Sequence, residues 1–517
     1  MWLSLSVFLN ERIMTLEPID LLEKKEGKKL YDYQIDAIDQ IFDRIRKFPS
    51  RYNLLFQLPT GGGKTVIFSE ISRRYILETQ KKVLILTHRI ELLGQTSRML
   101  DEIAVKNKII NSKLKSLPDE EEFQCFVAMV ETLNNRLNDA RFAMKNIGLV
   151  IVDEAHYNSF RKIFKFFENS IILGVTATPL SSNIKLPLKD NYNELIVGES
   201  ISALVERGFL AKASTYSYDV ALHSLKVGIN GDYTVSSSEK LYGNYFMQEK
   251  LLYAYEEKAK GTKTLIFNNG INTSKQVYEL FREANYEIRH LDNTHNEKDR
   301  QDILAWFKEK PDAILTSVSI LTTGFDEPTV ETVILNRATK SLTLYHQMIG
   351  RGSRWLPNKK EFCVIDLGNN SRRFGLWEYY INWQDIFRSP QSYIEGLYSD
   401  EEIEREFFYD MPPETRKFFP ASTIGFDMKE AYRSALKEGK KPRHAVETCL
   451  SYHAALILEN ATDFFEAMDL LRHLEKDIEY QIRQYAMCIA KATDNYLKWL
   501  QEEYTRKLQQ NIREGLS

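Results

Sequence analysis

The sequence has few cysteines, no long apolar run and no excess of charge of either sign. Its 517 residues include only four cysteines, which stand far apart, so neither a zinc site nor a disulfide framework is predicted. We expect them to be reduced core residues of a cytoplasmic protein. No segment reaches the roughly 20 apolar residues of a transmembrane helix, and we predict no membrane association. The 69 basic and 72 acidic residues leave a net charge of -3, so nucleic-acid binding would require a local groove.

The strongest signal is the stretch Leu58-Pro59-Thr60-Gly61-Gly62-Gly63-Lys64-Thr65. A strand-like run, 52–57, precedes it, and apolar residues at helical spacing, 66–77, follow it. A glycine turn between strand and helix aims backbone amides and the positive helix end at phosphate groups. Residues 60–65 are therefore predicted to bind ATP, with Lys64 reaching the β- and γ-phosphates and Thr65 holding Mg²⁺. The alternative is a glycine-rich structural turn.

Two acidic residues follow a run that is apolar enough to be a central parallel strand. The run is 147–152, and Asp153-Glu154-Ala155-His156 comes directly after it. Two carboxylates at a buried strand end repel each other unless a cation lies between them. We predict that Asp153 holds Mg²⁺ through water, and that Glu154 orients and deprotonates an attacking water. A solvated acidic turn is the alternative.

Gln34 stands between Tyr31-Asp32-Tyr33 and a helical pattern that runs to Ile45. An amide side chain donates and accepts hydrogen bonds at once, which suits the N6 and N7 edge of adenine. We therefore predict that Gln34 recognises the base, the alternative being an exposed helical glutamine.

Polar residues also follow three other apolar runs. Arg89 follows 82–87, Thr132 follows 123–130, and Thr176-Ala177-Thr178-Pro179 follows 171–175. Residues at the carboxyl edge of a parallel sheet are well placed to meet phosphates. We expect Thr176 and Thr178 to link the hydrolytic site to nucleic-acid contacts. Solvated helix starts are the alternative for Arg89 and Thr132.

A second alternation of strands and helices begins near residue 264 and predicts a second parallel sheet. It has no glycine turn, but it includes 322–328 and Gln347-Met348-Ile349-Gly350-Arg351-Gly352-Ser353-Arg354. We expect Arg351 and Arg354 to lie three apart on one helix face. Guanidinium groups match phosphate oxygens, so both are predicted to reach the γ-phosphate from the opposite domain, a device worth roughly 10³–10⁵ in rate. A surface helix with salt bridges is the alternative.

Taken in order, these segments resemble the motifs of superfamily 2 helicases over about residues 28–370. The matching segments are Gln34, the glycine turn, 87–95, 153–156, 176–179, 265–270, 323–328 and 347–354. The elements 31–34 and 319–326 resemble the branch of RadD, XPB and the type I and III restriction motors. They are less similar to the RNA helicases named for the Asp-Glu-Ala-His box. The cysteine-rich zinc module common in RadD-like proteins is missing from this sequence.

The resemblance implies two RecA-like domains that face each other, with ATP between them and one nucleic-acid strand across both. It implies that Asp326 takes part in ATP binding and that His156 and Gln347 take part in coupling. It also implies phosphate contacts from Arg89, Thr132, Asn268 and Thr316. DNA is expected rather than RNA. The alternatives are an ATP-controlled clamp or restriction motor subunit that does not unwind, and an RNA helicase.

The predicted fold class is α/β, with two tandem RecA-like domains and a mainly helical C-terminal domain. The expected divisions are an N-terminal arm (1–27), the first domain (28–205), a connector (206–245), the second domain (246–385) and the helical region (386–517). Apolar residues recur three or four apart from Phe464 to Tyr496, and Asp463 with Glu466 resembles a helix cap. That stripe indicates core packing, or else a surface for a protein partner.

Overall fold

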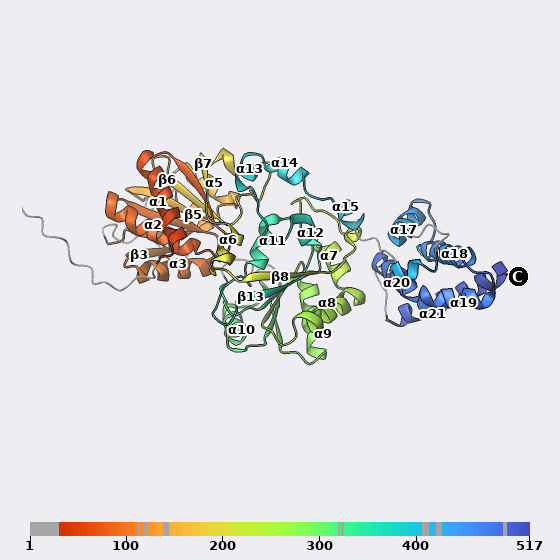
Figure 1. Ribbon diagram of the computed structural model, residues 1–517. Helices are drawn as coiled ribbons and strands as arrows, with labels where there is room; N and C mark the ends of the chain where they lie inside the picture. The colour runs from red at the N-terminus through yellow and green to blue at the C-terminus, as the bar shows by residue number, and fades with distance from the viewer. Residues whose placement is uncertain are drawn as a thin grey trace, which may run out of the picture.

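The computed structural model consists of two domains built on parallel sheets, followed by a helical bundle at one end of the molecule (Figure 1). It describes residues 30–111, 114, 116, 122–137, 144–318, 321, 325–405, 413–419, 426–489 and 494–516. The predicted fold class is thereby confirmed. The N-terminal arm expected at 1–27 lies outside the described residues. None of the described helices is long and apolar enough to cross a membrane.

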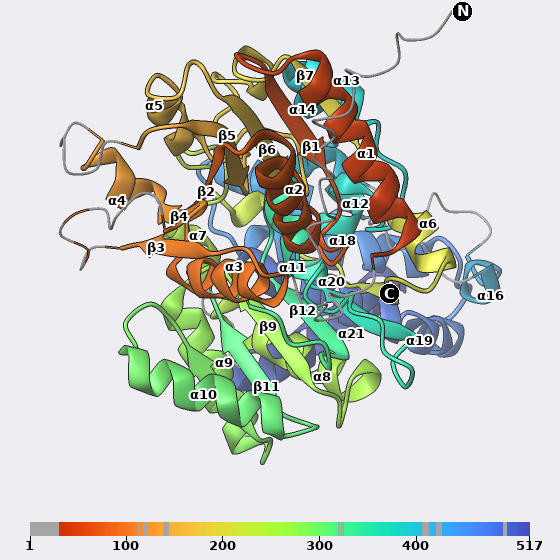
Figure 2. The same cartoon turned by 90° about the vertical axis from the view of Figure 1, so that its left-hand side faces the viewer.

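The first domain has a seven-stranded parallel sheet in the order β3-β4-β2-β5-β6-β1-β7. Its strands are β1 (Asn53–Gln57), β2 (Lys82–Thr87), β3 (Asn107–Ile110), β4 (Cys125–Met129), β5 (Ile147–Asp153), β6 (Ile171–Thr176) and β7 (Glu194–Val197). Its α-helices are α1 (Asp32–Lys47), α2 (Lys64–Thr79), α3 (Ile90–Glu102), α4 (Val130–Asn134), α5 (Arg161–Phe164) and α6 (Ile201–Glu206), and its 3₁₀ helices are η2 (Asn158–Phe160) and η3 (Leu188–Asp190). The middle strands are apolar along their length because helices cover both faces of the sheet (Figure 2).

The second domain has a six-stranded parallel sheet in the order β10-β11-β9-β12-β13-β8. Its strands are β8 (Lys212–Ser217), β9 (Thr264–Asn268), β10 (Ile288–Leu291), β11 (Ile314–Ser317), β12 (Thr332–Asn336) and β13 (Glu361–Asp366). Its helices are η4 (Leu222–Ser224), α7 (Val235–Tyr242), α8 (Tyr245–Lys258), α9 (Ile271–Glu283), α10 (Glu297–Glu309), α11 (Leu342–Ile349) and α12 (Asn370–Phe374). The expected connector therefore supplies an edge strand, because β8 pairs with β13.

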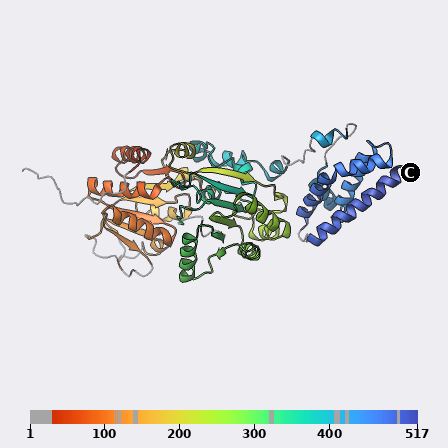
Figure 3. The ribbon, with the colours of Figure 1, turned by 60° about the horizontal axis from the view of Figure 1, so that its bottom comes forward.

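Beyond the second sheet the described chain is helical. The helices are α13 (Trp383–Arg388), α14 (Pro390–Glu395), α15 (Asp400–Arg405), α16 (Pro413–Arg416), α17 (Met428–Lys437), α18 (His444–Leu458), α19 (Phe464–His473), α20 (Glu475–Cys488) and α21 (Asp494–Leu516). Helices α17–α21 form a bundle with its own apolar core (Figure 3). The boundary expected at residue 385 falls inside α13, and the expected divisions stay predictions.

The apolar stripe between Phe464 and Tyr496 extends over α19, α20 and α21 rather than over one helix. Most of its members are buried in the bundle core, which favours core packing. The cap is present, because the Glu466 amide donates to Asp463 Oδ1 at 2.8 Å. These contacts hold the helices of the bundle together. The surface for a protein partner stays a prediction.

The register of the first sheet aligns three strand ends. Gln57 pairs with Thr176, and Asp153 pairs with Val175. The residues that follow β1, β5 and β6 therefore meet at one edge of the sheet, which is where ligands bind in open parallel sheets.

Candidate active site

The glycine turn between β1 and α2 depends on backbone conformations that favour glycine. Gly61 has φ 89° and Gly63 has φ 87°. A Cβ atom on Gly63 would lie 2.5 Å from Gln34 Nε2, so a side chain there would displace the Gln34 amide. Helix α2 begins at Lys64 without a side-chain cap. The first amides of α2 are thus left for a ligand, as a phosphate cradle requires.

Lys64 is folded back onto the turn, and its Nζ donates to the carbonyl oxygens of Leu58 at 3.2 Å and Pro59 at 3.3 Å. Burial lowers the pKa of Lys64, and the nearby carboxylates of Glu154 and Asp153 oppose that shift. Burial, and then Glu154, raise the pKa of Asp153 to about 7. The charges of Lys64 and Asp153 are therefore costly to bury, and each offsets part of that cost for the other.

Glu154 leads into a chain of polar contacts that reaches the second domain. Its Oε2 is buried without a hydrogen-bond partner, 3.3 Å from His156 Nδ1. His156 Nδ1 also shares a hydrogen bond with Thr176 Oγ1 at 3.0 Å. Thr176 Oγ1 donates to the Thr178 carbonyl at 3.1 Å, and Thr178 Oγ1 donates to Thr343 Oγ1 of α11 at 2.9 Å. Three of the four predicted coupling residues are thus connected.

The second domain brings its arginine to the glycine turn. Arg354 Nη1 donates to the Gly61 carbonyl oxygen at 2.9 Å, and its Nε donates to Asp326 Oδ1 at 2.9 Å. Arg351 Nη1 donates to the Phe325 carbonyl, and burial lowers the pKa of Arg351 to about 10. Gln34, Lys64 and Arg354, distant in sequence, therefore meet at the glycine turn, and Glu154 lies close enough to affect the pKa of Lys64.

One expectation about the arginines is wrong. Helix α11 ends at Ile349, so Arg351 and Arg354 lie in the turn after it and not on a shared helix face. Arg354 instead forms an isolated antiparallel bridge with Leu210. Gly350 and Gly352 flank Arg351, and glycine favours leaving a helix. The turn 350–354, here named the arginine turn, nevertheless brings Arg354 to the Gly61 carbonyl oxygen. It also brings Arg351 close enough to Glu154 for that carboxylate to affect its pKa.

The remaining predicted site residues differ in how close they lie to the glycine turn. Thr65 is half-buried in the first turn of α2, and Thr60 touches the arginine turn, because a Cβ atom on Gly350 would lie 2.6 Å from Thr60 Cβ. Gln347 is buried on α11, and its Nε2 has no hydrogen-bond partner. The motif predicted at 322–328 is described only from Phe325, since 322–324 lie outside the described residues.

Gln34 is buried in the first turn of α1, so the exposed helical glutamine is excluded. Its Nε2 donates to Tyr33 Oη at 3.4 Å, and Tyr33 Oη donates to the Gly62 carbonyl at 2.9 Å. Phe209 lies against both tyrosines, 4.5 Å from the Tyr31 ring and 5.0 Å from the Tyr33 ring. Arg207 lies over the Phe209 ring at 5.1 Å. Sequence reasoning missed Phe209 and Arg207, which belong to no recognisable motif.

The four predicted nucleic-acid contacts differ in accessibility. Arg89 at the start of α3 and Thr132 in α4 retain exposed surface. Asn268 and Thr316 are fully buried, and Asn268 Nδ2 donates to Thr316 Oγ1 at 2.9 Å. In this conformation neither side chain can touch a nucleic-acid strand. Both would therefore have to affect nucleic-acid binding through neighbouring residues. All four stay predictions.

The residues present fit a nucleoside triphosphate with Mg²⁺. The glycine cradle and Lys64 suit phosphate oxygens, and the unpartnered Glu154 Oε2 suits a water. Thr65 and Asp153 offer one hydroxyl and one carboxylate. Mg²⁺ is commonly held by one or two carboxylates, with phosphate and water as further ligands.

Comparisons with known proteins agree with this geometry. Residues 27–181 match the family "Type III restriction enzyme, res subunit", and residues 246–355 match "Helicase conserved C-terminal domain". The chain is 31% identical to the putative ATP-dependent helicase IRC3 of Saccharomyces cerevisiae, over 65% of this chain and 51% of that protein. It therefore spans about half the length of that relative.

Two solved structures share the fold. A fragment of a putative HsdR subunit of a type I restriction enzyme from Vibrio vulnificus YJ016 has a TM-score of 0.52 at 21% identity, covering 68% of this chain and 67% of that chain. The ATP-dependent Type ISP restriction-modification enzyme LlaBIII bound to DNA has a TM-score of 0.52 at 16% identity, covering 95% of this chain and 43% of that chain. With two family matches in the expected order, the chain belongs to the superfamily 2 helicases, in the branch that includes the restriction-enzyme motors.

Proposed function

We propose that this chain is an ATP-driven motor that translocates along or remodels DNA, with Mg²⁺-ATP as its fuel. The observation that carries the proposal is the 2.9 Å hydrogen bond from Arg354 Nη1 to the Gly61 carbonyl oxygen. It joins the arginine turn of one domain to the glycine turn of the other. A hydrolytic site divided in this way is complete only when the two domains approach each other.

In this proposal each residue has one task. The amides of the glycine turn and Lys64 bind phosphate, and Gln34 binds the adenine edge. Lys64 has to leave the carbonyls of Leu58 and Pro59 to do so. Mg²⁺, when bound by Thr65 and Asp153, supplies positive charge beside the phosphates. Glu154 accepts a proton from the attacking water, at the buried oxygen that has no hydrogen-bond partner.

Arg351 and Arg354 stabilise the negative charge that develops on the transferred phosphoryl group. Their approach is linked to Glu154 through the contacts of His156, Thr176, Thr178 and Thr343. A nucleic-acid strand that binds the closed arrangement of the two domains more tightly than the open one would therefore stimulate hydrolysis. Its binding shifts the population of molecules toward those with a complete site.

DNA is the proposed nucleic-acid substrate because of the names of the similar proteins. The yeast relative is named an ATP-dependent helicase, and one similar structure is a restriction-modification enzyme bound to DNA. Strand number, polarity and unwinding are left to experiment.

The test is the ATPase rate with single-stranded, duplex and forked DNA and with RNA, at one stated salt concentration, since phosphate-driven affinity depends steeply on salt. We expect strong stimulation by a DNA ligand and none in Lys64→Ala, whose unfolding transition should match the wild type. Lys106→Ala, at an exposed lysine of the same domain, is the control. Undiminished turnover by Lys64→Ala would refute the assigned site. Stimulation by RNA alone would overturn the choice of DNA.

A second candidate is an ATP-controlled clamp or motor subunit within a restriction or defence assembly. The match of residues 27–181 to a restriction-enzyme subunit family favours it. A clamp would bind DNA with an affinity that depends on ATP, while DNA-stimulated turnover would be negligible.

A further inference from the structure

Residues 376–405, here named the strap, run from the second domain to the first and back. After α12 the chain crosses to the first domain, where α13 lies beside β7, and α15 then returns to the second domain (Figure 1). Trp383, Ile386 and Phe387 of α13 are buried in an apolar cluster that includes residues of both sheets, and α13 contacts β7 and η3 of the first domain. The strap therefore contacts both domains away from the glycine turn.

On the first domain, polar contacts reinforce this apolar packing. Gln384 Nε2 donates to the Leu195 carbonyl of β7 at 2.8 Å. Lys189 Nζ donates to the Arg388 carbonyl at 2.7 Å. Because both acceptors are backbone oxygens, these contacts hold the path of the chain itself.

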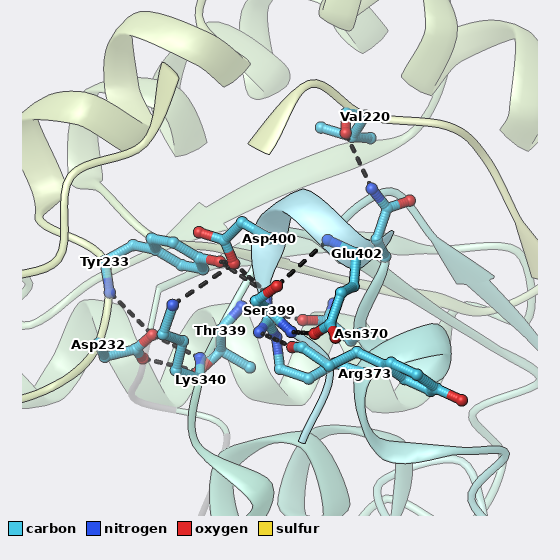
Figure 4. Close-up of polar contacts among 12 residues, drawn as sticks. Val220, Asp232, Tyr233, Thr339, Lys340, Asn370, Arg373, Ser399, Asp400 and Glu402 are labelled. Carbon is cyan, nitrogen blue, oxygen red and sulfur yellow. Dashed lines mark hydrogen bonds and ion pairs between the residues drawn. The ribbon is translucent and has the colours of Figure 1, made fainter. Parts of the chain in front are cut away.

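On the second domain, Asp400 at the start of α15 is the centre of the contact (Figure 4). Its Oδ1 accepts from Tyr233 Oη at 2.6 Å and from Arg373, and lies 3.4 Å from Lys340 Nζ. Arg373 Nη1 also donates to the Tyr398 carbonyl at 2.7 Å. Three donors from separate segments thus converge on one carboxylate.

The helix that carries Asp400 is itself fixed. The Ser399 amide donates to Glu402 Oε2 at 2.8 Å, and the Glu402 amide donates to Ser399 Oγ at 3.2 Å, which is a capping box. Ile403 is buried in the core of the second domain. Asp400 is therefore held in place rather than presented on a mobile end.

The same cluster anchors the loop before α11. Asp232 accepts from Thr339 Oγ1 at 2.6 Å and from the Lys340 amide at 2.8 Å (Figure 4). Helix α11 begins two residues after Lys340 and ends just before the arginine turn. Asp400 therefore acts on the base of the helix that leads to Arg351 and Arg354.

The strap also touches α11 at Trp383, and the residue just before the strap contacts the same helix. The Trp383 ring lies 5.9 Å from the His346 ring, edge to face. Tyr345 Oη donates to the Gly375 carbonyl, just before the strap, at 2.9 Å. Helix α11 is thus held between its anchored N-terminal loop and a strap that is fixed to β7.

We propose that the strap is a positioning element for the arginine pair, with Gln384 and Asp400 as its two anchor residues. It sets how closely Arg351 and Arg354 approach the glycine turn, because the domains cannot separate or rotate freely while both ends of the strap are held. The effect on hydrolysis rests on the proposed function of the arginines. The effect on domain separation does not.

The variants are Gln384→Ala, Asp400→Asn and the two combined. Asp400→Asn is chosen because the amide keeps an oxygen acceptor for the buried Arg373, whereas removing the whole side chain would leave a gap beside that guanidinium and could prevent folding. Glu401→Ala, at the exposed acidic neighbour on the same helix, is the matched control. The distance between the domains is measured with fluorophores on non-natural amino acids at the exposed positions Lys106 and Lys298.

Each single variant should broaden the distance distribution and lower the stimulated kcat on the order of 10-fold, with the KM for ATP unchanged, because small misplacements of catalytic groups cost this much or more. The double variant should be no worse than a single one, since the strap restrains the domains only while both ends are firmly held, and weakening either end already loosens it. Unchanged distances, additive losses or a loss that simply follows the melting temperature would overturn the proposal. If the wild type shows no ATPase activity, the proposed function fails, and the distance distributions still decide the role of the strap.

Discussion

Lys359 is a buried lysine that binds the backbone of the arginine turn. Its Nζ donates to the Val330 carbonyl at 2.7 Å and to the Gly352 carbonyl at 2.9 Å. Burial lowers its pKa to about 8. The ammonium group of Lys359 thus binds Gly352, which lies between Arg351 and Ser353, but burial makes its positive charge unfavourable in the folded protein.

This shift predicts a pH dependence of stability. An unfolded lysine has a pKa near 10.4, so between about pH 8 and pH 10 the unfolded chain binds more protons at this position than the folded chain. The contribution of Lys359 to the free energy of unfolding therefore rises with pH and is lost as the pH falls through 8. Denaturant unfolding should show the stability deficit of Lys359→Met growing by about 1–3 kcal/mol from pH 7.5 to pH 10.

The neighbouring Lys360 is exposed, and Lys360→Met is the control, which should show no such trend. A deficit of Lys359→Met that stays constant over the same range would show that Lys359 titrates normally.

Residue by residue, the sequence predicted best where the site is continuous in the chain. Lys64 and the pair Asp153 and Glu154 are recognisable because a strand end and a helix start dictate their neighbours. Phe209 could not be found in this way, because it meets Tyr31 only after the chain has folded. The arginine turn was misread as helical, since the spacing of Arg351 and Arg354 also suits a helix.

At the level of elements, apolar runs predicted the central strands, because a parallel sheet covered on both faces leaves no polar positions. The edge strand β8 lies in the segment expected as a connector. Its partner β13 lies about 150 residues away, and local pattern carries no information on that pairing. The stripe from Phe464 onward indicated helix, while its division among α19, α20 and α21 depends on how those helices turn back on one another.

The helical bundle contains a buried polar contact on which we expect its stability to depend. His453 of α18 is fully buried, with its Nε2 2.6 Å from Asp477 Oδ2 of α20 and its Nδ1 2.6 Å from Tyr504 Oη of α21. His453→Ala would leave the buried Asp477 carboxylate without the imidazole and Tyr504 Oη with only its 3.3 Å contact to Cys449 Sγ, and we expect a loss of about 3–5 kcal/mol. Hydrogen exchange should show it as lost protection in α18, α20 and α21.

His444→Ala, at the half-exposed start of the same helix, should leave that protection intact. Nucleotide affinity should be unchanged in both variants, because the bundle lies at the opposite end of the molecule from the first domain, which carries the glycine turn (Figure 1). Unaltered exchange in His453→Ala would contradict the assigned role of the contact.

At the scale of the whole molecule, the order of motifs predicted two facing domains, and the structure adds how they are tied together. The arginine turn meets the glycine turn at one place, and the strap holds the domains at another. Sequence pattern could not reveal the strap, because α13 and α15 bear no motif and their contacts reach segments about 170 to 190 residues away. A motor with two such connections is expected to close along a restricted path.

The central claim is that the two domains complete one hydrolytic site, and Arg354→Ala tests it most directly. Nucleotide binding and DNA-stimulated hydrolysis are measured side by side, with Arg282→Ala, at an exposed arginine of the same domain, as the control. The account predicts unchanged nucleotide affinity and a loss of hydrolysis of roughly 10³-fold or more. Equal losses of binding and hydrolysis, or undiminished hydrolysis, would contradict it.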